Sequence, residues 1–283
     1  MDAPESIGIV GTGLVGTALA GLVVRRLPGA RIRAVEPQGT HRAAVAARLP
    51  KIDWAHCAAE LADCDMVLLA CPPGAVVPLA REILEAGEAL VVDTASVKGR
   101  ICAEMADAPR FVGGHPLAGG NRVGPFTAEP EALTTARFVL TPHAGNAEAD
   151  LARVEAVLAR LGFTVLRVDP EAHDAVLART SHLPHLMAYG FAGTLAGMDE
   201  DELAAFASRS TREIARFASA NTRMWAEILE QNGDAVSAAL DDLILELMTL
   251  RNAFAGAGGA PLAGRLAAAA GTAQMLNGSP QDE

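Results

Sequence analysis

The stretch GIVGTGLVG, residues 8–16, constrains the fold more strongly than any other part of the sequence. Three glycines at G-x-G-x-x-G spacing come directly after a short β-branched run from Ser6 to Val10. From Leu14 to Arg26 the apolar residues recur at helical spacing, and Arg31 to Val35 predicts a second strand. A strand, glycine turn, helix and strand in this order predict a dinucleotide-binding unit.

Each part of such a unit has a task in binding a dinucleotide. The first glycine allows a tight turn, the second lets the backbone approach a pyrophosphate, and the third lets the helix pack on the strand. The unpaired N–H groups and the positive dipole end at the start of the helix favour phosphate. We therefore expect the pyrophosphate to bind at this turn, formed by Gly11, Thr12, Gly13, Leu14, Val15 and Gly16.

An acidic residue follows at the position that distinguishes the two nicotinamide cofactors. Glu36 lies twenty residues after Gly16, at the end of the second predicted strand. A carboxylate there can accept hydrogen bonds from the ribose hydroxyls and would repel a 2′-phosphate. The sequence therefore predicts NAD as cofactor, with NADP as the less favoured alternative because Arg33 and Arg42 lie nearby.

Further apolar runs follow, each ending in Gly, Pro, Ser or Asp, at residues 65–73, 89–99, 110–120, 136–143 and 164–170. Runs of this kind are typical of strands that are covered on both faces. Because ligands bind beyond the carboxyl ends of strands in open α/β sheets, the residues that end these runs are candidates for the site. They predict Cys71, Pro72 and Ser96 beside the cofactor and His115 on the same edge.

The chain changes character after Pro170. Residues 171–197, 199–220 and 225–255 have helical periodicity, with Pro184 as an expected kink or break and Asn232–Asp234 as an interruption. We predict an α/β fold, with a Rossmann-type doubly wound sheet in residues 1–169. An all-helical domain for substrate binding and dimerisation follows in residues 170–283.

Composition excludes several other classes of protein. A net charge of −11 disfavours a nucleic-acid surface. The first residues lack the basic start of a signal peptide, and no apolar run reaches the roughly 18 residues of a membrane span. The cysteines form no CxxC pair and no cluster with metal-ligand spacing. We expect a cytoplasmic protein with a small-molecule substrate, without a metal, and with no nucleic-acid or membrane partner.

Five stretches of this sequence resemble the prephenate/arogenate dehydrogenase family of tyrosine biosynthesis: GTGLVG, VDTASVKG, GGHPLAGG, HDAVLARTSHLPH and REIARFASANTRMW. They occur in that family's order and span nearly the whole chain. The resemblance implies an NAD-dependent enzyme that oxidises and decarboxylates prephenate to 4-hydroxyphenylpyruvate, and a homodimer that forms through the helical domain.

The resemblance also assigns roles to individual residues. His115 resembles the catalytic histidine, and Ser96 the hydroxyl that hydrogen-bonds this histidine and the substrate. Arg216 resembles the arginine that binds the side-chain carboxylate of the substrate. A second active-site histidine and the supporting positions correspond to His185, Arg212, Glu213 and Trp225. From the residues alone, core histidines are an equally open interpretation, and a solvated helix face is the favoured one for the arginines.

The sequence departs from the family pattern in two places. The stretch FASRSTREIAR lacks the glycines that the family usually has ahead of its arginine motif, and Glu213 replaces an Asp. Asn121 and Arg122 stand where the family often has an acid. Loss of a negative charge disfavours the ammonium group of arogenate, so we expect prephenate, with Asn121 near it. Arogenate and 4-amino-4-deoxyprephenate stay open as alternative substrates. A β-hydroxyacid dehydrogenase is disfavoured, because it would need a catalytic lysine in the helical half, where the sequence has none. The remaining alternative is a non-catalytic module that senses NAD.

Overall fold

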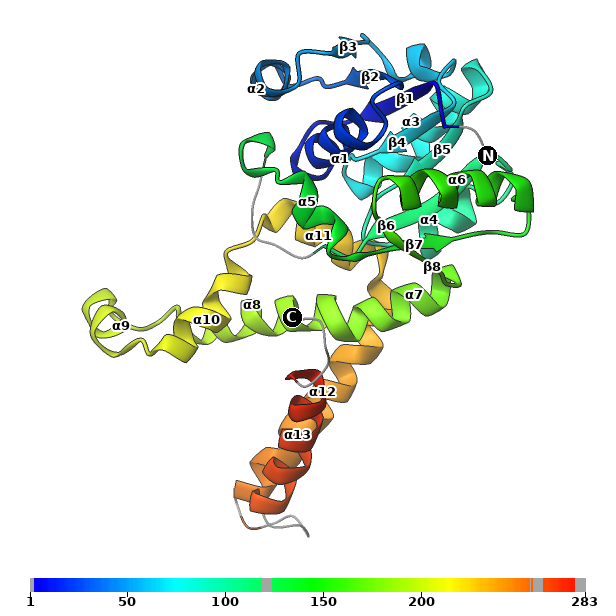
Figure 1. Ribbon diagram of the computed structural model, residues 1–283. Helices are drawn as coiled ribbons and strands as arrows, with labels where there is room; N and C mark the ends of the chain where they lie inside the picture. The colour runs from blue at the N-terminus through cyan, green and yellow to red at the C-terminus, as the bar shows by residue number, and fades with distance from the viewer. Residues whose placement is uncertain (1–2, 119–123, 255, 257–261, 278–283) are drawn as a thin grey trace. The chain divides into compact units, whose positions relative to one another are not determined.

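The computed structural model describes residues 3–118, 124–254, 256 and 262–277. Its chain divides into two compact units, Met1–Gly233 and Asp234–Glu283. The first unit contains all eight strands and the helices up to α11, and the second contains α12 and α13 (Figure 1). Within the described residues, no helix is both long and apolar enough to cross a membrane.

Eight strands form a single sheet in the order β3-β2-β1-β4-β5-β6-β7-β8. Their bounds are β1 Ser6–Val10, β2 Arg31–Val35, β3 Ile52–Trp54, β4 Met66–Leu69, β5 Leu90–Asp93, β6 Phe111–Pro116, β7 Arg137–Thr141 and β8 Thr164–Arg167. The first six strands are parallel, β7 runs antiparallel to β6, and β8 is parallel to β7. The expected doubly wound sheet is confirmed, and it also contains the three-residue strand β3, which the sequence pattern does not predict.

Helices cover both faces of this sheet. They are α1 Leu14–Arg26, α2 Gly39–Arg48, α3 Pro73–Ala86, α4 Gly99–Glu104, α5 Pro130–Thr134 and α6 Glu148–Arg160, with short 3-10 turns at Ala58–Leu61 and Pro125–Thr127. Apolar residues of α1 and α6 form one core with alternate strand residues such as Ile7, Ile9 and Leu68. The intervening strand residues, such as Val67 and Leu69, pack with α3 and α4 on the other face.

The second half is helical, as the sequence predicts. Its elements are α7 Pro170–Leu177, the π-helical turn η3 Ala178–His182, α8 Leu183–Leu195, α9 Glu200–Phe206, α10 Arg209–Ala218, α11 Thr222–Gln231, α12 Gly233–Phe254 and α13 Leu262–Asn277. Pro184 does not interrupt the helical run, because it lies in the first turn of α8, where a missing N–H is tolerated. The expected helix over 199–220 is divided where Ser208 caps α10 through the Thr211 N–H.

Helix α11 contributes directly to the core beneath the sheet. Trp225 and Ile228 are buried in the same apolar cluster as Val67 and Ile83. The polypeptide therefore returns from α8–α10 to the nucleotide-binding half before α12 begins (Figure 1). This return brings Trp225 into the same compact unit as the carboxyl ends of the strands.

Candidate active site

The turn between β1 and α1 has the geometry that its three glycines predict. Gly11 has a φ of +84°, and a Cβ there would lie 2.5 Å from the Ala70 carbonyl oxygen. A Cβ on Gly16 would lie 1.9 Å from the carbonyl oxygen of Gly11, so helix and turn touch. Beside Gly13, in contrast, no atom of the described residues lies within 4 Å of such a Cβ. The turn is thus closed by two glycines and open beside the third.

The start of α1 presents backbone donors at this opening. Gly13 is the N-cap residue and provides no side-chain cap, and the first turn of α1 carries no acidic residue. The N–H groups of such a first turn have no acceptor within the helix, which suits an anion. Cys71 and Pro72 follow β4, the neighbour of β1. Burial raises the pKa of the Cys71 thiol to about 12, so this side chain is neutral.

Glu36 closes the far side of the turn. Its Oε2 accepts hydrogen bonds from the Thr12 backbone N–H at 2.7 Å and from the Thr12 hydroxyl at 3.0 Å. Its Oε1 accepts from the Gln38 N–H at 2.8 Å. Arg33, the nearby cation on β2, forms ion pairs with Asp53 and Asp63. The carboxylate therefore holds the turn together and keeps acceptor capacity mainly on Oε1.

The imidazole of His115 lies at the carboxyl end of β6, as the sequence predicts. The side chain is partly exposed. Desolvation by burial is the main reason why the pKa of His115 lies well below its ordinary value of 6.5, and electrostatic interactions with Lys98 and the neighbouring histidines act in the same direction. At neutral pH the ring is therefore uncharged and able to accept a proton.

His115 has a different partner from the one that the resemblance implies. Its Nδ1 lies 2.9 Å from Nε2 of His173, and Nδ1 of His173 lies 2.7 Å from Oδ1 of Asp174. Ser96 is half-buried in the loop after β5, and its hydroxyl makes no hydrogen bond to His115. The expected contact between Ser96 and the imidazole is therefore replaced in this structure by His173. Whether Ser96 contacts the substrate or cofactor stays a prediction.

A buried ion pair supports the strand that carries His115. The Lys98 ammonium donates to a carboxylate oxygen of Asp93 and, at 2.8 Å, to the carbonyl oxygen of Gly114. Asp93 also accepts from the Gly114 N–H at 2.8 Å, and both charged side chains are fully buried. A Cβ on Gly114 would lie 2.6 Å from the Asp93 carbonyl oxygen. Gly114 thus allows the strands to pack closely beside His115.

Two further histidines lie at the π-helical turn η3 and in the first turn of α8. His182 is fully buried; its Nδ1 accepts from the Asn232 amide at 3.1 Å, and its Nε2 has no hydrogen-bond partner among the described residues. Burial lowers the pKa of His182 to about 4. His185, one turn later, stacks on Trp225 with ring centroids 3.7 Å apart and donates from Nδ1 to the Ser181 carbonyl. Turns of this kind are frequent at functional sites.

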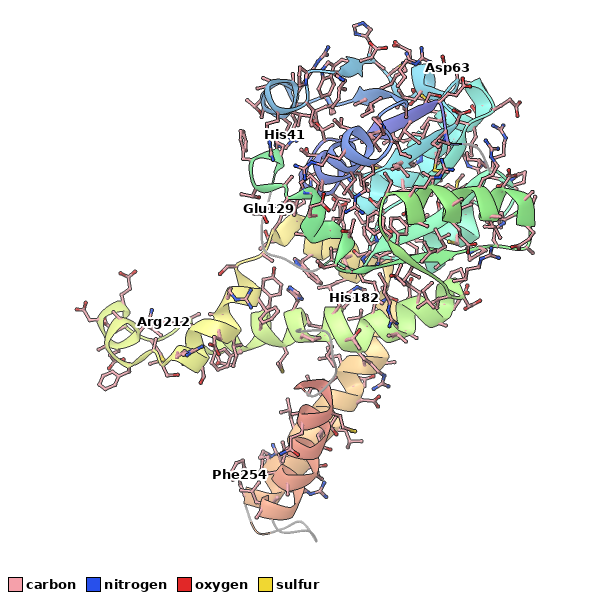
Figure 2. The ribbon with its side chains drawn as sticks, viewed as in Figure 1. His41, Asp63, Glu129, His182, Arg212 and Phe254 are labelled. Atoms are coloured by element: carbon pink, nitrogen blue, oxygen red, sulfur yellow. The ribbon has the colours of Figure 1, made fainter. Side chains whose placement is uncertain are left out.

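The arginines of α10 are exposed. The Arg216 guanidinium lies over the Phe217 ring at 4.8 Å, and Phe217 contacts the edge of His185 at 5.1 Å. Burial lowers the pKa of His185, and the nearby charge of Arg216 acts in the same direction. Figure 2 shows Arg212 on α10, well separated from His182 along the helices. Glu213 binds Arg209 at 2.7 Å, and Asn121 lies outside the described residues.

Several residues of the site were not found from the sequence: His173, Asp174, Lys98, Asp93 and Asn232. Four of them, all but Asn232, lie within the motifs VDTASVKG and HDAVLARTSHLPH, where the sequence alone assigned them no role. The sequence offered one signal for them, the adjacent pair His173 and Asp174 among apolar residues of a predicted helix. Nothing nearby in the sequence shows which residue this pair would contact. In the described parts of the chain, histidine, cysteine and carboxylate side chains form no cluster of three that could hold a metal ion.

This arrangement, an open glycine turn and a neutral imidazole on one edge of a sheet, agrees with the comparison with known families. Residues 20–167 match the nucleotide-binding domain of prephenate dehydrogenase, and residues 169–261 match its dimerisation domain. The chain belongs to the prephenate dehydrogenase family. It is therefore an oxidoreductase of the NAD-dependent prephenate dehydrogenase type.

The similar proteins are named after different substrates. The chain is 30% identical to a cyclohexadienyl dehydrogenase of Zymomonas mobilis over 68% of its own length and 69% of that protein. It is 27% identical to a prephenate dehydrogenase of Bacillus subtilis, over 87% and 69% of the two chains. It is also similar to the structure of prephenate dehydrogenase from A. aeolicus in complex with hydroxyphenyl propionate and NAD+. The TM-score is 0.89 at 25% identity, with 98% and 99% of the two chains covered.

Proposed function

We propose that this chain catalyses the oxidative decarboxylation of prephenate to 4-hydroxyphenylpyruvate and CO2, with reduction of NAD to NADH. The observation that carries the proposal is the neutral imidazole of His115 at the carboxyl end of β6, on the sheet edge where the open turn beside Gly13 lies. Family membership supports it.

His115 acts as the general base. Its uncharged ring accepts the proton of the substrate's ring hydroxyl while hydride leaves the same ring carbon. The C–CO2 bond then breaks, its electron pair enters the ring, and the ring becomes aromatic. The resulting phenolate regains the proton from the imidazolium, so His115 ends the cycle neutral. Aromatisation and loss of CO2 make the reaction effectively irreversible.

Arg216 binds the side-chain carboxylate of the substrate. Its guanidinium lies over the Phe217 ring, which meets His185 edge to face, and His185 in turn stacks on Trp225. We infer that these rings form the apolar wall on which the substrate ring rests, and that the cation binds the carboxylate at its end. Arg212, Glu213 and Asn121 keep supporting roles in the proposal, as does the Ser96 hydroxyl.

The dinucleotide is held by the β1–α1 turn. The backbone donors at the start of α1 bind the pyrophosphate, Glu36 accepts from the ribose, and Cys71 and Pro72 border the site after β4. Bound NAD supplies the hydride acceptor. We propose NAD in preference to NADP because Glu36 is a buried carboxylate. Arg33, the nearby cation on β2, is already paired with Asp53 and Asp63.

The helical residues 170–283 form the substrate and dimerisation domain in this proposal, and a homodimer is the expected assembly. The match of residues 169–261 to a dimerisation domain supports it. Large apolar side chains on α12 are exposed within their own unit, among them Leu245, Leu247 and Phe254. A second copy would cover them. The cytoplasmic location stays a prediction from the sequence.

A matrix of cofactors and substrates tests the proposal. NAD and NADP are each combined with prephenate and arogenate, and NADH or NADPH formation is followed by absorbance. We expect the highest kcat/KM for NAD with prephenate. Higher kcat/KM with arogenate, or with 4-amino-4-deoxyprephenate added as a third substrate, would replace prephenate in the proposal. No turnover with any substrate despite NAD binding would contradict the enzymatic assignment.

A further inference from the structure

The hydrogen bond between His115 and His173 has no role in the reaction as described above. It joins the end of β6 to α7 across 58 residues of sequence, and its Nδ1–Nε2 distance is 2.9 Å. We propose that His173 and Asp174 are positioning residues that fix the tautomer of His115, so that Nε2 is its basic nitrogen. This inference rests on the proposed function, because it assigns the base to His115.

The direction of the hydrogen bonds follows from the groups that can only donate. The Lys98 N–H donates to Oδ1 of Asp174 and the Gly99 N–H to Oδ2, each at 2.8 Å. The carboxylate therefore acts as an acceptor on both oxygens, and Nδ1 of His173 must carry the proton that it shares with Oδ1. In neutral His173 the other nitrogen, Nε2, then carries a lone pair.

The same logic determines the state of His115. Because Nε2 of His173 can only accept, Nδ1 of His115 must donate to it, and the proton of the neutral ring of His115 lies on Nδ1. Nε2 of His115 is left with its lone pair, and it is the nitrogen that can take a proton from a substrate hydroxyl. Without His173 nothing described in this structure would select this tautomer.

The pair is held rigidly in place. His173 and Asp174 are 2% and 6% exposed, so neither contact competes with bulk water. A Cβ on Gly99 would lie 3.1 Å from Oδ2 of Asp174, which shows how closely the loop after β5 approaches the carboxylate. The Asn232 amide donates to the Asp174 carbonyl oxygen at 2.9 Å. The loop after β5 therefore fixes the Asp174 carboxylate, and Asn232 fixes the backbone of α7 that carries both side chains.

The contact with His173 and Asp174 stabilises His115 most strongly when the His115 ring is charged. Once Nε2 has taken the substrate proton, the Nδ1–H of the imidazolium donates a charge-assisted hydrogen bond to His173, and Asp174 supplies a compensating negative charge. This stabilisation opposes the desolvation of the charged ring and exists mainly after proton transfer begins. No proton needs to pass from His115 to His173, and the one taken from the substrate remains on Nε2.

Two substitutions of His173 separate this role from simple packing. In His173→Gln the amide oxygen can still accept from Nδ1–H of His115, whereas His173→Leu fills similar space without an acceptor. We expect kcat to fall roughly 10²-fold or more in the Leu variant and within about tenfold in the Gln variant, because the wrong tautomer removes general-base catalysis. KM for the substrate and the Kd for NAD should change little in either. His143→Gln is the control, since His143 binds the carbonyl oxygens of Ala108 and Phe111 near the start of β6.

A spectroscopic measurement reads the tautomer without reference to activity. In full-length protein labelled with 15N-histidine, the His115 signals are assigned by their loss in His115→Asn. We expect a protonated Nδ1 and an unprotonated Nε2 in the wild type and the His173→Gln variant, and a shift toward protonated Nε2 in His173→Leu.

The outcomes distinguish this inference from the proposed function. A wild-type His115 protonated on Nε2, or equal losses of kcat in the Leu and Gln variants, would overturn the role of His173. Normal turnover in His115→Asn would instead overturn the assignment of the base, even if the NMR spectra show the expected tautomer.

Discussion

Two regions at the carboxyl edge of the sheet, the β1–α1 turn and the site around His115, are assembled over very different lengths of chain. The turn is built from residues between Gly11 and Glu36. The hydrogen bond from Thr12 to Glu36, which closes it, joins residues only 24 apart in the sequence. Around His115 the bonds join residues 58 and 76 apart, from β6, α7 and the loop after β5.

The two regions also differ in charge. The turn is formed by backbone N–H groups and one carboxylate. The other region contains His115 and His182, whose pKa values are lowered by burial, and a fully buried Lys98–Asp93 pair. A local turn is sufficient to bind phosphates, whereas a base needs surroundings that several distant segments must supply together.

His115→Asn separates the two regions most sharply. The asparagine cannot accept a proton at neutral pH, so we expect kcat to fall by about 10²–10⁴-fold. The Kd for NAD should remain unchanged, because the β1–α1 turn is not altered. Steady-state kinetics and a fluorescence titration with NAD measure the two effects. A parallel loss of NAD binding would show that the two regions are not independent.

The same contrast explains what could be predicted from the sequence. The bounds of β1, α1 and β2 agree with the sequence pattern to the residue, because a strand–turn–helix unit is specified by neighbouring residues. The three-residue strand β3 is too short to give a pattern, and the direction of β7 depends on how the chain returns to the sheet.

The position of His115 was predictable, because it ends an apolar run, but its partner was not. Nothing in a linear sequence indicates that His173 and Asp174 meet a histidine 58 residues earlier. Ser96, the hydroxyl expected to hydrogen-bond His115, does not bond it here. Only the long-range packing of α7 against the loop after β5 brings the His–Asp pair to His115.

Acidification tests the charge difference between the regions. The pKa of His182 is about 4 in the folded protein and 6.5 in the unfolded chain. The unfolded state therefore binds more protons between these values, and the free energy of unfolding falls as pH decreases from 6.5 toward 4. For a fully buried group with this shift, the free energy of unfolding falls by on the order of 3 kcal/mol over this pH range. The lowered pKa of His115 decreases the free energy of unfolding in acid as well.

Chemical denaturation at several pH values measures this loss of stability. We expect His182→Asn to flatten the pH dependence, while His56→Gln, a substitution of an exposed histidine, leaves it unchanged. An equal slope in all three proteins would mean that the histidines of the site do not determine acid stability.

Arg216→Ala tests whether the substrate contacts the helical side of the site. Loss of a charge-assisted bond to a carboxylate costs about 1.5–3 kcal/mol, so KM for prephenate should rise roughly ten- to hundredfold. KM for NAD should stay within about twofold, since the turn is unaffected. Arg223→Ala is the matched control, because Arg223 is an exposed cation on α11 that pairs with Glu227. An unchanged KM for prephenate would contradict the proposed role of Arg216.

Glu36→Gln is the smallest change and concerns the turn alone. The amide can no longer accept from Thr12 and Gln38 on both oxygens, and it no longer repels a 2′-phosphate. We expect KM for NAD to rise about tenfold and KM for NADP to fall, with kcat for prephenate nearly constant. Glu85→Gln, an exposed acid on α3, changes the net charge by the same amount and serves as control. If kcat fell while both cofactor KM values stayed constant, Glu36 would belong functionally to the catalytic region, and the separation of the two regions would be wrong.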